Sequence, residues 1–592
     1  MNVQLAQQVQ ELLGTSELVI ITERVDDVAL LMGQMVKMGF VEILDRHLPR
    51  HWKQRQLSWG WTAVIWLAYI LTEGDHRKVS VAAYINGMQR TLSGLSGQVI
   101  DPLDFNDDRL SHLLQHLSRP RYWHEIEQDL NARSLEVYDL SSEAIRCDAT
   151  TVSGEHDVTD GGLLQFGHSK DDPSRPQIKV MTGSLDPLGM PLATDVLSWE
   201  RADDGLYIPL IKRIEAGIRK TGLLFVGDCK MSALATRAYV AGHQHVYLSP
   251  LPLTGATAEA MGEWISEGIA KDREGELERM VRFNPRAEAV LAAEGYEFER
   301  RCCLEEGTAA WAERVLVVRS PGHAERQAQG LDKRLATAEQ KLAALTPARG
   351  RGKRQISDEA TLIAAIDHVL KDQRVDGLLT VAWERQVEQT TQYVGRGRGS
   401  ATRAQRMREH IRYHITGITR QDGAIQARRQ RFGWKAFATN APQERLSLAD
   451  AVLCYRNEYR IERIFNRLKS RVHIAPLYVK RDDQIEGLTY LLTLGIRVLT
   501  VMEFVLRRSL QHDQVKLPGL HPENRRKHTD TPTAERLLKA FSDVSLTILK
   551  TATGEDILQR LTPLSALQQD ILQRLGLSVA LYQQLEIQNM RG

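Results

Sequence analysis

The stretch TGLLFVGD, residues 221–228, indicates the fold of the central part of this chain. A short apolar run that follows a turn and ends at an acid is typical of a strand buried in a parallel sheet. A second run, EAIRCD at 143–148, ends in the same way. We therefore expect each strand to end at an aspartate, the first at Asp148 and the second at Asp228. The carboxyl ends of the strands are where α/β sheets bind their ligands.

The segments around these two strands predict a mixed sheet with flanking helices. In QIKVMTGSLDPLGMPLATDVLSW the Asp-Pro-x-Gly turn predicts a hairpin formed by residues 178–184 and 191–197. LYIPLIKRIEAGI (206–218) has helical periodicity, and HVYLSPL (245–251) is typical of another strand. The resulting order of strand, hairpin, helix, strand, helix and strand predicts an α/β core inside a larger α+β multidomain chain.

Composition and charge are those of an ordinary globular protein: 592 residues, 26% of them charged, with a net charge of +2. Residues 1–140 hold 13 Lys and Arg against 18 Asp and Glu, and their apolar periodicity predicts an all-helical domain. Oligomerisation, docking and DNA binding all remain open for that domain. From Arg396 to Lys435 there are 11 Lys and Arg against two acids, which is typical of a solvated face or of a phosphate-backbone contact.

The five cysteines form no C-x-x-C pair, so neither a zinc ribbon nor a disulfide framework is indicated. We expect a reducing, cytoplasmic environment. The first residues lack the pattern of a signal peptide. The longest apolar runs, 62–71 and 488–496, are too short to span a bilayer, so we expect buried core helices there and no membrane partner.

The stretch YRNEYRIERIFNRLKSR, residues 455–471, predicts a helix with three stripes. The apolar stripe, which we expect to pack on a core, consists of Ile461, Ile464, Phe465, Leu468 and Val472. A cationic stripe consists of Arg456, Arg460, Arg463, Arg467 and Arg471. Between the two lie Tyr455, Glu458, Glu462, Asn466 and Lys469.

The two glutamates of this helix have no cation three or four residues away. They also repel each other, because like charges at this spacing cost roughly 0.2–0.5 kcal/mol. A surface helix stabilised by its own salt bridges is therefore a poor explanation. Carboxylates hold divalent cations and arginine rows hold polyanions, so chemistry on phosphodiesters would use both stripes.

Three motifs together resemble those of DDE-type insertion-sequence transposases. They are DATTV at Asp148, FVGD at Asp228, and Y-x6-E-x6-K at Tyr455, Glu462 and Lys469. More narrowly, the helix is similar to the Y-x2-R-x3-E-x6-K signature of the IS-four superfamily. The resemblance covers roughly residues 140–500. It implies an RNase H-like fold with a large insertion, and a DNA transposase that cleaves transposon ends and transfers strands into target DNA.

The resemblance also implies roles for individual residues. Asp148, Asp228 and Glu462 would be the catalytic acids and would hold two Mg²⁺ ions, with Mn²⁺ as a substitute. The residues expected to contact DNA are Tyr455, Lys469, Arg456, Arg460, Arg463 and Arg467. The signature arginine falls on Glu458, so Arg456 or Arg460 would replace its phosphate contact, and Glu458 stands as an alternative acid or further metal ligand.

The expected partner is double-stranded DNA, as transposon end and as target, bound by a homodimer. Two alternatives remain open: an RNase H-like nuclease that cuts without joining, and an inactive DNA-binding derivative. The predicted domains are a helical domain (1–140), two parts of the catalytic core (141–252 and 431–512), an insertion between them (253–430), and a linker with a helical tail (513–592).

Overall fold

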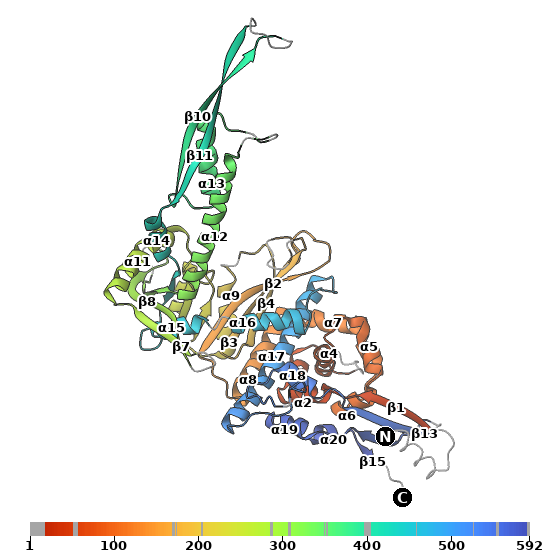
Figure 1. Ribbon diagram of the computed structural model, residues 1–592. Coiled ribbons are helices and arrows are strands. Elements are labelled where there is room, and N and C mark those ends of the chain that lie inside the picture. Colours follow the sequence, from red (N-terminus) through yellow and green to blue (C-terminus); the bar gives the residue numbers. More distant parts are fainter. Residues whose placement is uncertain are drawn as a thin grey trace. The chain divides into compact units, whose positions relative to one another are not determined.

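The computed structural model describes residues 18–50, 57–167, 172, 174–202, 205–283, 288–305, 309–348, 350, 353, 355–395, 404–456, 459–524, 526–551, 554 and 556–588. The chain divides into two units (Figure 1). Unit 1 consists of Met1–Ser249, Cys303–Trp311 and Cys454–Gly592. Unit 2 consists of Pro250–Cys302 and Ala312–Leu453.

A mixed sheet lies at the centre of unit 1, with strands in the order β4-β3-β2-β5-β6. The strands are β2 (Ala144–Ser153), β3 (Gln177–Asp186), β4 (Met190–Ser198), β5 (Leu224–Gly227) and β6 (Val246–Pro250). β2, β3 and β4 pair antiparallel, whereas β2, β5 and β6 pair parallel. The predicted hairpin is confirmed as β3 and β4, and the mixed α/β character of the chain is confirmed with it.

Two helices connect the parallel strands, as the apolar periodicity predicts. They are α9 (Tyr207–Ile218), which packs on β3 and β4, and α10 (Leu234–Gly242). The buried face of α9 consists of Tyr207, Leu210, Ile211 and Ile214, at the three- and four-residue spacing of one helix face. This spacing fixes which side of α9 meets the sheet, and with it the direction of the first helical residue, Tyr207.

Strand β2 is longer than the sequence indicates. The prediction that Asp148 ends its strand is wrong, because β2 continues to Ser153. The strand continues because its other side is paired with β3 as far as Ser153, which faces Gln177. Only the parallel partner β5 stops, at Gly227 opposite Cys147. Asp148 therefore lies where the parallel pairing ends, inside a strand that continues.

The helices before β2 belong to unit 1 and pack with its longest helix, α17 (Asp482–His512). They are α2 (Val28–Lys37), α3 (Phe40–His47), α4 (Trp59–Glu73), α5 (Lys78–Asn86), α6 (Gln89–Ser96), η1 (Pro102–Phe105), α7 (Asp107–Leu117) and α8 (Pro120–Val137). α17 contacts α2, α4, α7 and β4. In α8, Trp123 stacks on Tyr490 of α17 with ring centroids 4.4 Å apart.

α17 is long and apolar enough to cross a membrane, which corrects the expectation that no segment of the chain reaches that length. In the fold, 89% of this apolar stretch is buried inside the protein. It is therefore the central core helix of unit 1, and the expectation of a buried helix around residues 488–496 is confirmed.

Helices α7 and α17 cross closely at Gly487. A Cβ atom at this position would lie 2.1 Å from the backbone oxygen of Leu114. We expect Gly487→Ala to lower the free energy of unfolding by about 1–3 kcal/mol, because the two helices must separate to admit the methyl group. Denaturant midpoints measure the loss. Gly242→Ala in α10 is the matched control, since its Cβ would meet nothing within 4 Å, and an equal loss in both variants would contradict the prediction.

The two ends of the chain form a second sheet in unit 1, with the order β1-β13-β14-β15. Its strands are β1 (Leu18–Arg24), β13 (Ser545–Thr551), β14 (Asp556–Leu561) and β15 (Ile587–Gln588), with helices α18 (Ala534–Lys539), α19 (Ala566–Arg574) and α20 (Ala580–Gln583) nearby in sequence. The predictions of an all-helical N-terminal domain and a helical C-terminal tail are therefore wrong. The cause is long-range pairing, since β1 finds its antiparallel partner β13 at the other end of the sequence.

Unit 2 contains four strands in the order β12-β9-β8-β7 and a separate two-stranded sheet. The strands of the first are β7 (Glu278–Phe283), β8 (Ala289–Cys302), β9 (Trp311–Arg319) and β12 (Trp434–Thr439); the second is formed by β10 (Leu379–Tyr393) and β11 (Gln405–Arg420). The helices are α11 (Gly255–Glu274), α12 (Pro321–Leu345), α13 (Glu359–Asp372) and α14 (Asp422–Gln430). The sequence pattern predicts a strand at 313–320 and a helix at 325–345, and both are confirmed as β9 and α12. It does not predict β7, β8, β10 or β11.

Candidate functional site

Asp148 and Asp228 lie next to each other at the end of the parallel pairing in unit 1. Cys147 of β2 faces Gly227 of β5 in the parallel register, and each aspartate is the next residue along its strand. Neighbouring strands lie about 5 Å apart and alternate residues share a face, so the two side chains leave the sheet on the same side. Both residues are half-buried. The sequence prediction that the two aspartates meet is supported by this register.

Tyr207, the first residue of α9, holds the second aspartate. Its hydroxyl donates a hydrogen bond of 2.6 Å to Oδ1 of Asp228. The same oxygen accepts from the backbone N–H of Lys230 at 2.9 Å. Burial raises the pKa of Tyr207 well above its ordinary value, and the negative charges of Asp228 and then Asp148 raise it further. The phenol thus stays protonated and fixes the direction of the Asp228 carboxylate.

Tyr207 is a residue that the sequence reasoning missed. The segment predicts a helix, and nothing in its pattern distinguishes a core tyrosine from one that contacts an acid. The only signal is position, since a tyrosine at the start of a helix that covers a sheet can reach a strand end. Cys147, on the opposite face of β2 from Asp148, is fully buried, and burial raises the pKa of its thiol to about 12.

We expect Tyr207→Phe to reduce any activity that depends on Asp228 by about tenfold, with little loss of stability. A hydrogen bond to a charged group contributes about 1.5–3 kcal/mol, and part of that loss falls on the orientation of the carboxylate. The reaction rate measures the effect. Tyr239→Phe is the matched control, because Tyr239 donates to Glu215 at 2.8 Å on α9, another half-buried pair. Equal rates for Tyr207→Phe and the parent protein would exclude the positioning role.

The structure describes the predicted signature helix as three elements, and residues 457 and 458 between the first two lie outside the described residues. α15 (Leu448–Tyr455) ends at Tyr455, α16 covers Tyr459–Asn466, and a π-helical turn covers Arg467–Arg471. The prediction of one α-helix from 455 to 471 is therefore wrong. In the π-turn the N–H of Val472 donates to the oxygen of Arg467, five residues back, at 3.1 Å. Tyr455 and Lys469 thus lie outside the helix that carries Glu462.

The apolar stripe of this segment is confirmed. Its members Ile461, Ile464, Phe465, Leu468 and Val472 are all buried. Helix α16 lies against β2, the strand that carries Asp148. The core thus fixes α16 beside β2.

Glu462 is exposed, and within the described part of the chain it has neither a hydrogen bond nor an ion pair. Tyr455, Arg456 and Lys469 are half-buried. Glu458 and the side chain of Arg460 lie outside the described residues. The DNA contacts assigned to these residues, and the role of Glu458 as an alternative acid, stay predictions.

The second half of the arginine stripe, for which we expect DNA contacts at Arg463 and Arg467, has partners inside the protein instead. Nη2 of Arg463 donates to both carboxylate oxygens of Glu503, at 2.6 and 2.7 Å. Arg467 is 6% exposed; it donates to the same Glu503 and, at 3.0 Å through Nε, to Glu535. Arg471 donates to the backbone oxygen of Leu71 at 2.7 Å.

Glu503 explains why Arg463 and Arg467 turn into the protein, and the sequence pattern does not reveal it. It lies on α17, is 3% exposed, and also accepts from the backbone N–H of Ala534 at 2.8 Å. Arg507 contacts it at 3.4 Å. Burial lowers the pKa of Arg507, Glu503 opposes this change, and the nearby Arg463 and Arg467 add to it. A single carboxylate thus gathers three guanidinium groups, and Arg467 is a structural residue.

The residues fit a metal ion in part. Among the described residues, which include Asp148, Asp228 and Glu462, no group of three or more acid, His or Cys side chains lies close enough to hold one ion. Mg²⁺ usually takes only one or two carboxylates from a protein and completes its shell with water and phosphate. The aspartate pair fits that requirement, whereas the site of three acids is not assembled in this structure.

No known family model matches this chain, and no curated protein does. Several chains of solved structures have some similarity to this chain. One of them is the cryo-EM structure of the piggyBac transposase synaptic complex with hairpin DNA, with a TM-score of 0.23 and 9% sequence identity. The alignment covers 49% of this chain and 58% of that one. At this TM-score the similarity does not establish a shared fold, and the function proposed below does not rest on it.

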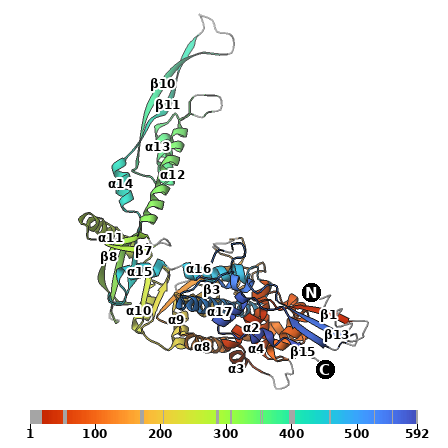
Figure 2. The same ribbon diagram turned by 60° about the horizontal axis from the view of Figure 1, so that its bottom comes forward.

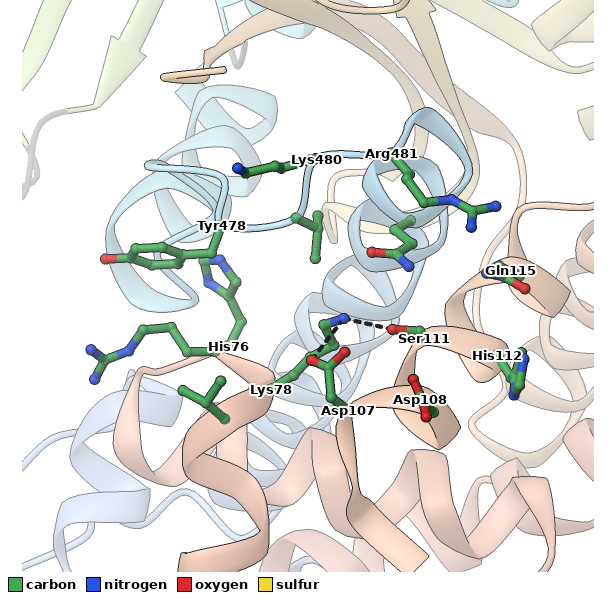
Figure 3. Close-up of a pocket in the computed structure, with 14 residues that line it drawn as sticks. His76, Lys78, Asp107, Asp108, Ser111, His112, Gln115, Tyr478, Lys480 and Arg481 are labelled. Carbon is green, nitrogen blue, oxygen red and sulfur yellow. Dashed lines mark hydrogen bonds and ion pairs between the residues drawn. The ribbon is translucent and has the colours of Figure 1, made fainter. Parts of the chain in front are cut away.

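A polar cavity of about 620 Å³ lies between the N-terminal helices and the segment that follows the π-turn (Figure 3). Lys78 of α5 reaches Ser111 at 2.6 Å and Asp107 at 3.0 Å, both on α7. On the other wall stands Tyr478, with the guanidinium of Arg77 5.9 Å from its ring centroid. Asp107 balances the charge of Lys78, and Asp75 balances that of Arg77 at 2.9 Å. The cavity lies between two parts of unit 1. Because these charges are paired within the protein, we assign the cavity no ligand.

Proposed function

We propose that this chain is a DNA transposase of an insertion sequence, with an RNase H-like catalytic core formed by the central sheet of unit 1. The observation that carries the proposal is the pair Asp148 and Asp228, adjacent at the end of the parallel pairing. The packing of α16 against β2 supports it, because this helix carries the third predicted acid, Glu462, beside the same strand.

In this proposal Asp148 and Asp228 would hold a Mg²⁺ ion at the end of the parallel pairing. A bound Mg²⁺ ion would polarise the phosphoryl oxygen and activate the attacking hydroxyl. Tyr207 keeps the Asp228 carboxylate oriented toward the open end of the sheet, since its hydroxyl already donates to Oδ1. Asp148 provides the second carboxylate from the neighbouring strand.

Glu462 would complete the acids only after a rearrangement, because it does not form one cluster with the aspartates in this structure. It is exposed on a short helix bounded by the π-turn, and a shift of α16 along β2 would move it toward the pair. We propose that binding of a transposon end drives this shift. Tyr455, Arg456, Arg460 and Lys469 remain the proposed contacts to that DNA, and a homodimer the proposed assembly.

The test is to incubate the full-length protein and Mg²⁺ with DNA that contains the genomic flanks of its gene, and to map cuts at nucleotide resolution. Transposase activity predicts cuts at two defined ends and, after addition of a target plasmid, covalently joined products. Cuts without joined products would instead identify a nuclease. DNA binding without any cut, in Mg²⁺ and in Mn²⁺, would identify an inactive derivative and contradict the proposal.

A further inference from the structure

The two-stranded ribbon of β10 and β11 extends beyond the core that supports it (Figures 1 and 2). At its base, Leu379, Tyr413 and Ile415 are buried in a cluster with residues of α12 and α13. From residue 384 to 393 of β10, and from 405 to 410 of β11, every residue is exposed. An uncovered two-stranded ribbon is marginally stable and leaves both edges open. Regular pairing over this length, without a core to support it, indicates a surface made for a partner.

The strand register assigns the side chains of the ribbon to two faces. Partners across an antiparallel pair share a face, and alternate residues along a strand do so as well. One face therefore collects the even-numbered residues of both strands. On β11 they are Arg406, Arg408, His410, Arg412 and His414, and opposite them on β10 are Gln392, Thr390, Glu388, Gln386 and Glu384. Every β11 residue in this row is basic, and we call it the basic face.

The acidic residue in this part of β11 does not lie on the basic face. Glu409 lies on the opposite face, where it accepts a hydrogen bond of 3.0 Å from Gln389. Arg412, at the base of the row, donates to the backbone oxygen of Pro347 at 3.5 Å. Arg406 and Arg408 are exposed, and within the described residues neither has an ion pair. These two arginines are therefore available to an external anion.

We infer that the basic face binds the phosphate backbone of double-stranded DNA. Residues two apart on a strand are separated by about 7 Å, so Arg406 and Arg408 present two guanidinium groups at that spacing on one face of the ribbon. The neighbouring Thr390 and Gln392 are side chains of the kind that also donate to phosphates. A two-stranded ribbon fits the major groove, which is about 12 Å wide.

An acidic protein surface is a weaker candidate for the same face. The centre of a protein–protein interface is enriched in aromatic and other apolar residues and depleted of charges. The exposed part of the basic face carries none of these, since its apolar counterparts Val387 and Met407 lie on the opposite face. The inference rests on the proposed function only in taking DNA as the substrate, and it assigns the contact to a surface separate from the aspartate pair.

The experiment measures binding of the full-length protein to a fluorescent 30-base-pair duplex by anisotropy, in EDTA so that no cleavage occurs. For Arg406→Gln with Arg408→Gln, we expect about 10- to 100-fold weaker binding at 0.1 M salt. The slope of log affinity against log salt should fall by about two, because each of the two arginines would neutralise one phosphate. Unchanged thermal unfolding would show that the double variant keeps its fold.

A matched pair of single variants tests whether the effect belongs to one face. Arg408→Gln should lower the salt slope by about one, whereas Arg385→Gln, an exposed arginine of the opposite face, should leave it unchanged. Equal losses in both, or an unchanged slope in the double variant, would overturn the inference. So would a double variant that keeps its DNA affinity but loses binding to immobilised polyglutamate.

The outcome is separable from that of the proposed function. Asp160→Ala, at an exposed position of unit 1 outside the aspartate pair, should bind the duplex as tightly as the parent protein, because the ribbon belongs to unit 2. If the parent protein cleaves DNA and the ribbon variant binds DNA normally, the inference is wrong and the transposase proposal stands. If the ribbon variant loses salt-dependent binding and the parent protein does not cleave DNA, the inference stands and the transposase proposal is wrong.

Discussion

Asp228→Ala is expected to lower the rate of DNA cleavage by about a thousandfold, which corresponds to about 4 kcal/mol of transition-state stabilisation. The physical reason is the loss of one of two carboxylates that would hold the metal and, through it, the scissile phosphate. Asp148→Ala should have a similar effect, because the two residues occupy equivalent places on β5 and β2. Single-turnover cleavage of an end-labelled transposon end in Mg²⁺ measures the rates.

Two further variants separate charge from structure. Asp228→Asn keeps the size of the side chain and an oxygen for the Tyr207 hydroxyl, so a loss as large as that of the alanine variant would assign the effect to the carboxylate charge. Asp160→Ala is the matched control, an exposed aspartate in the loop after β2. Cleavage at the parental rate by a folded Asp228→Ala variant would end the proposed mechanism.

The same assay distinguishes the two candidate glutamates. Glu462→Ala should match the aspartate variants if Glu462 is the third acid, while Glu458→Ala should retain cleavage. The reverse result would make Glu458 the acid and would mean that the E-x6-K spacing does not identify the catalytic residue in this chain.

Glu503→Ala is expected to lower the free energy of unfolding by about 3–5 kcal/mol, the usual consequence of removing one partner from a buried ion pair. Arg463 and Arg467 both donate to this carboxylate, and the buried Arg467 would keep Glu535 as its acidic partner. The backbone N–H of Ala534 would lose its acceptor as well. Chemical denaturation, followed by the signal of unit 1, measures the change.

The control for this prediction is Glu535→Ala. Glu535 is about one-third exposed, and Arg467 would retain Glu503 in that variant, so the loss should be about 1 kcal/mol or less. A triple variant with Glu503→Leu, Arg463→Met and Arg467→Met should recover most of the stability, because it removes the buried carboxylate together with the two arginines that donate to it. A loss below about 1 kcal/mol for Glu503→Ala would contradict the assignment of these arginines to the core.

Asp148 and Asp228 were predictable as a pair because their signal is local, although Asp148 lies inside β2 and not at its end. A buried strand of four to six apolar residues followed by an acid can be recognised in a short window, and two such windows predicted Asp148 and Asp228. The hairpin of β3 and β4 was predictable for the same reason, since its turn is encoded by four consecutive residues. The buried stripe around Ile461 followed from helical spacing alone.

The partners of charged residues were not predictable, because they come from distant segments. The arginine stripe was interpreted with its own helix as the only source of acids, but Glu503 approaches from α17 and Glu535 from α18. Tyr207 reaches Asp228 across the gap between a helix and a strand. The π-turn at Arg467–Arg471 was not predicted either, because its residues have ordinary helical propensities.

By itself, the sequence determined the elements whose stability is local: the apolar strands, the Asp-Pro-x-Gly hairpin, the amphipathic helices and the positions of the acids that follow strands. Only the tertiary structure decided which of these residues meet. It placed the two aspartates together through the register of β2 and β5, and it placed Arg463 and Arg467 on Glu503. It also paired β1 with β13. The physical reason is that hydrophobic spacing specifies a face within one segment, whereas charge pairing and strand pairing depend on which segments the folded core brings together.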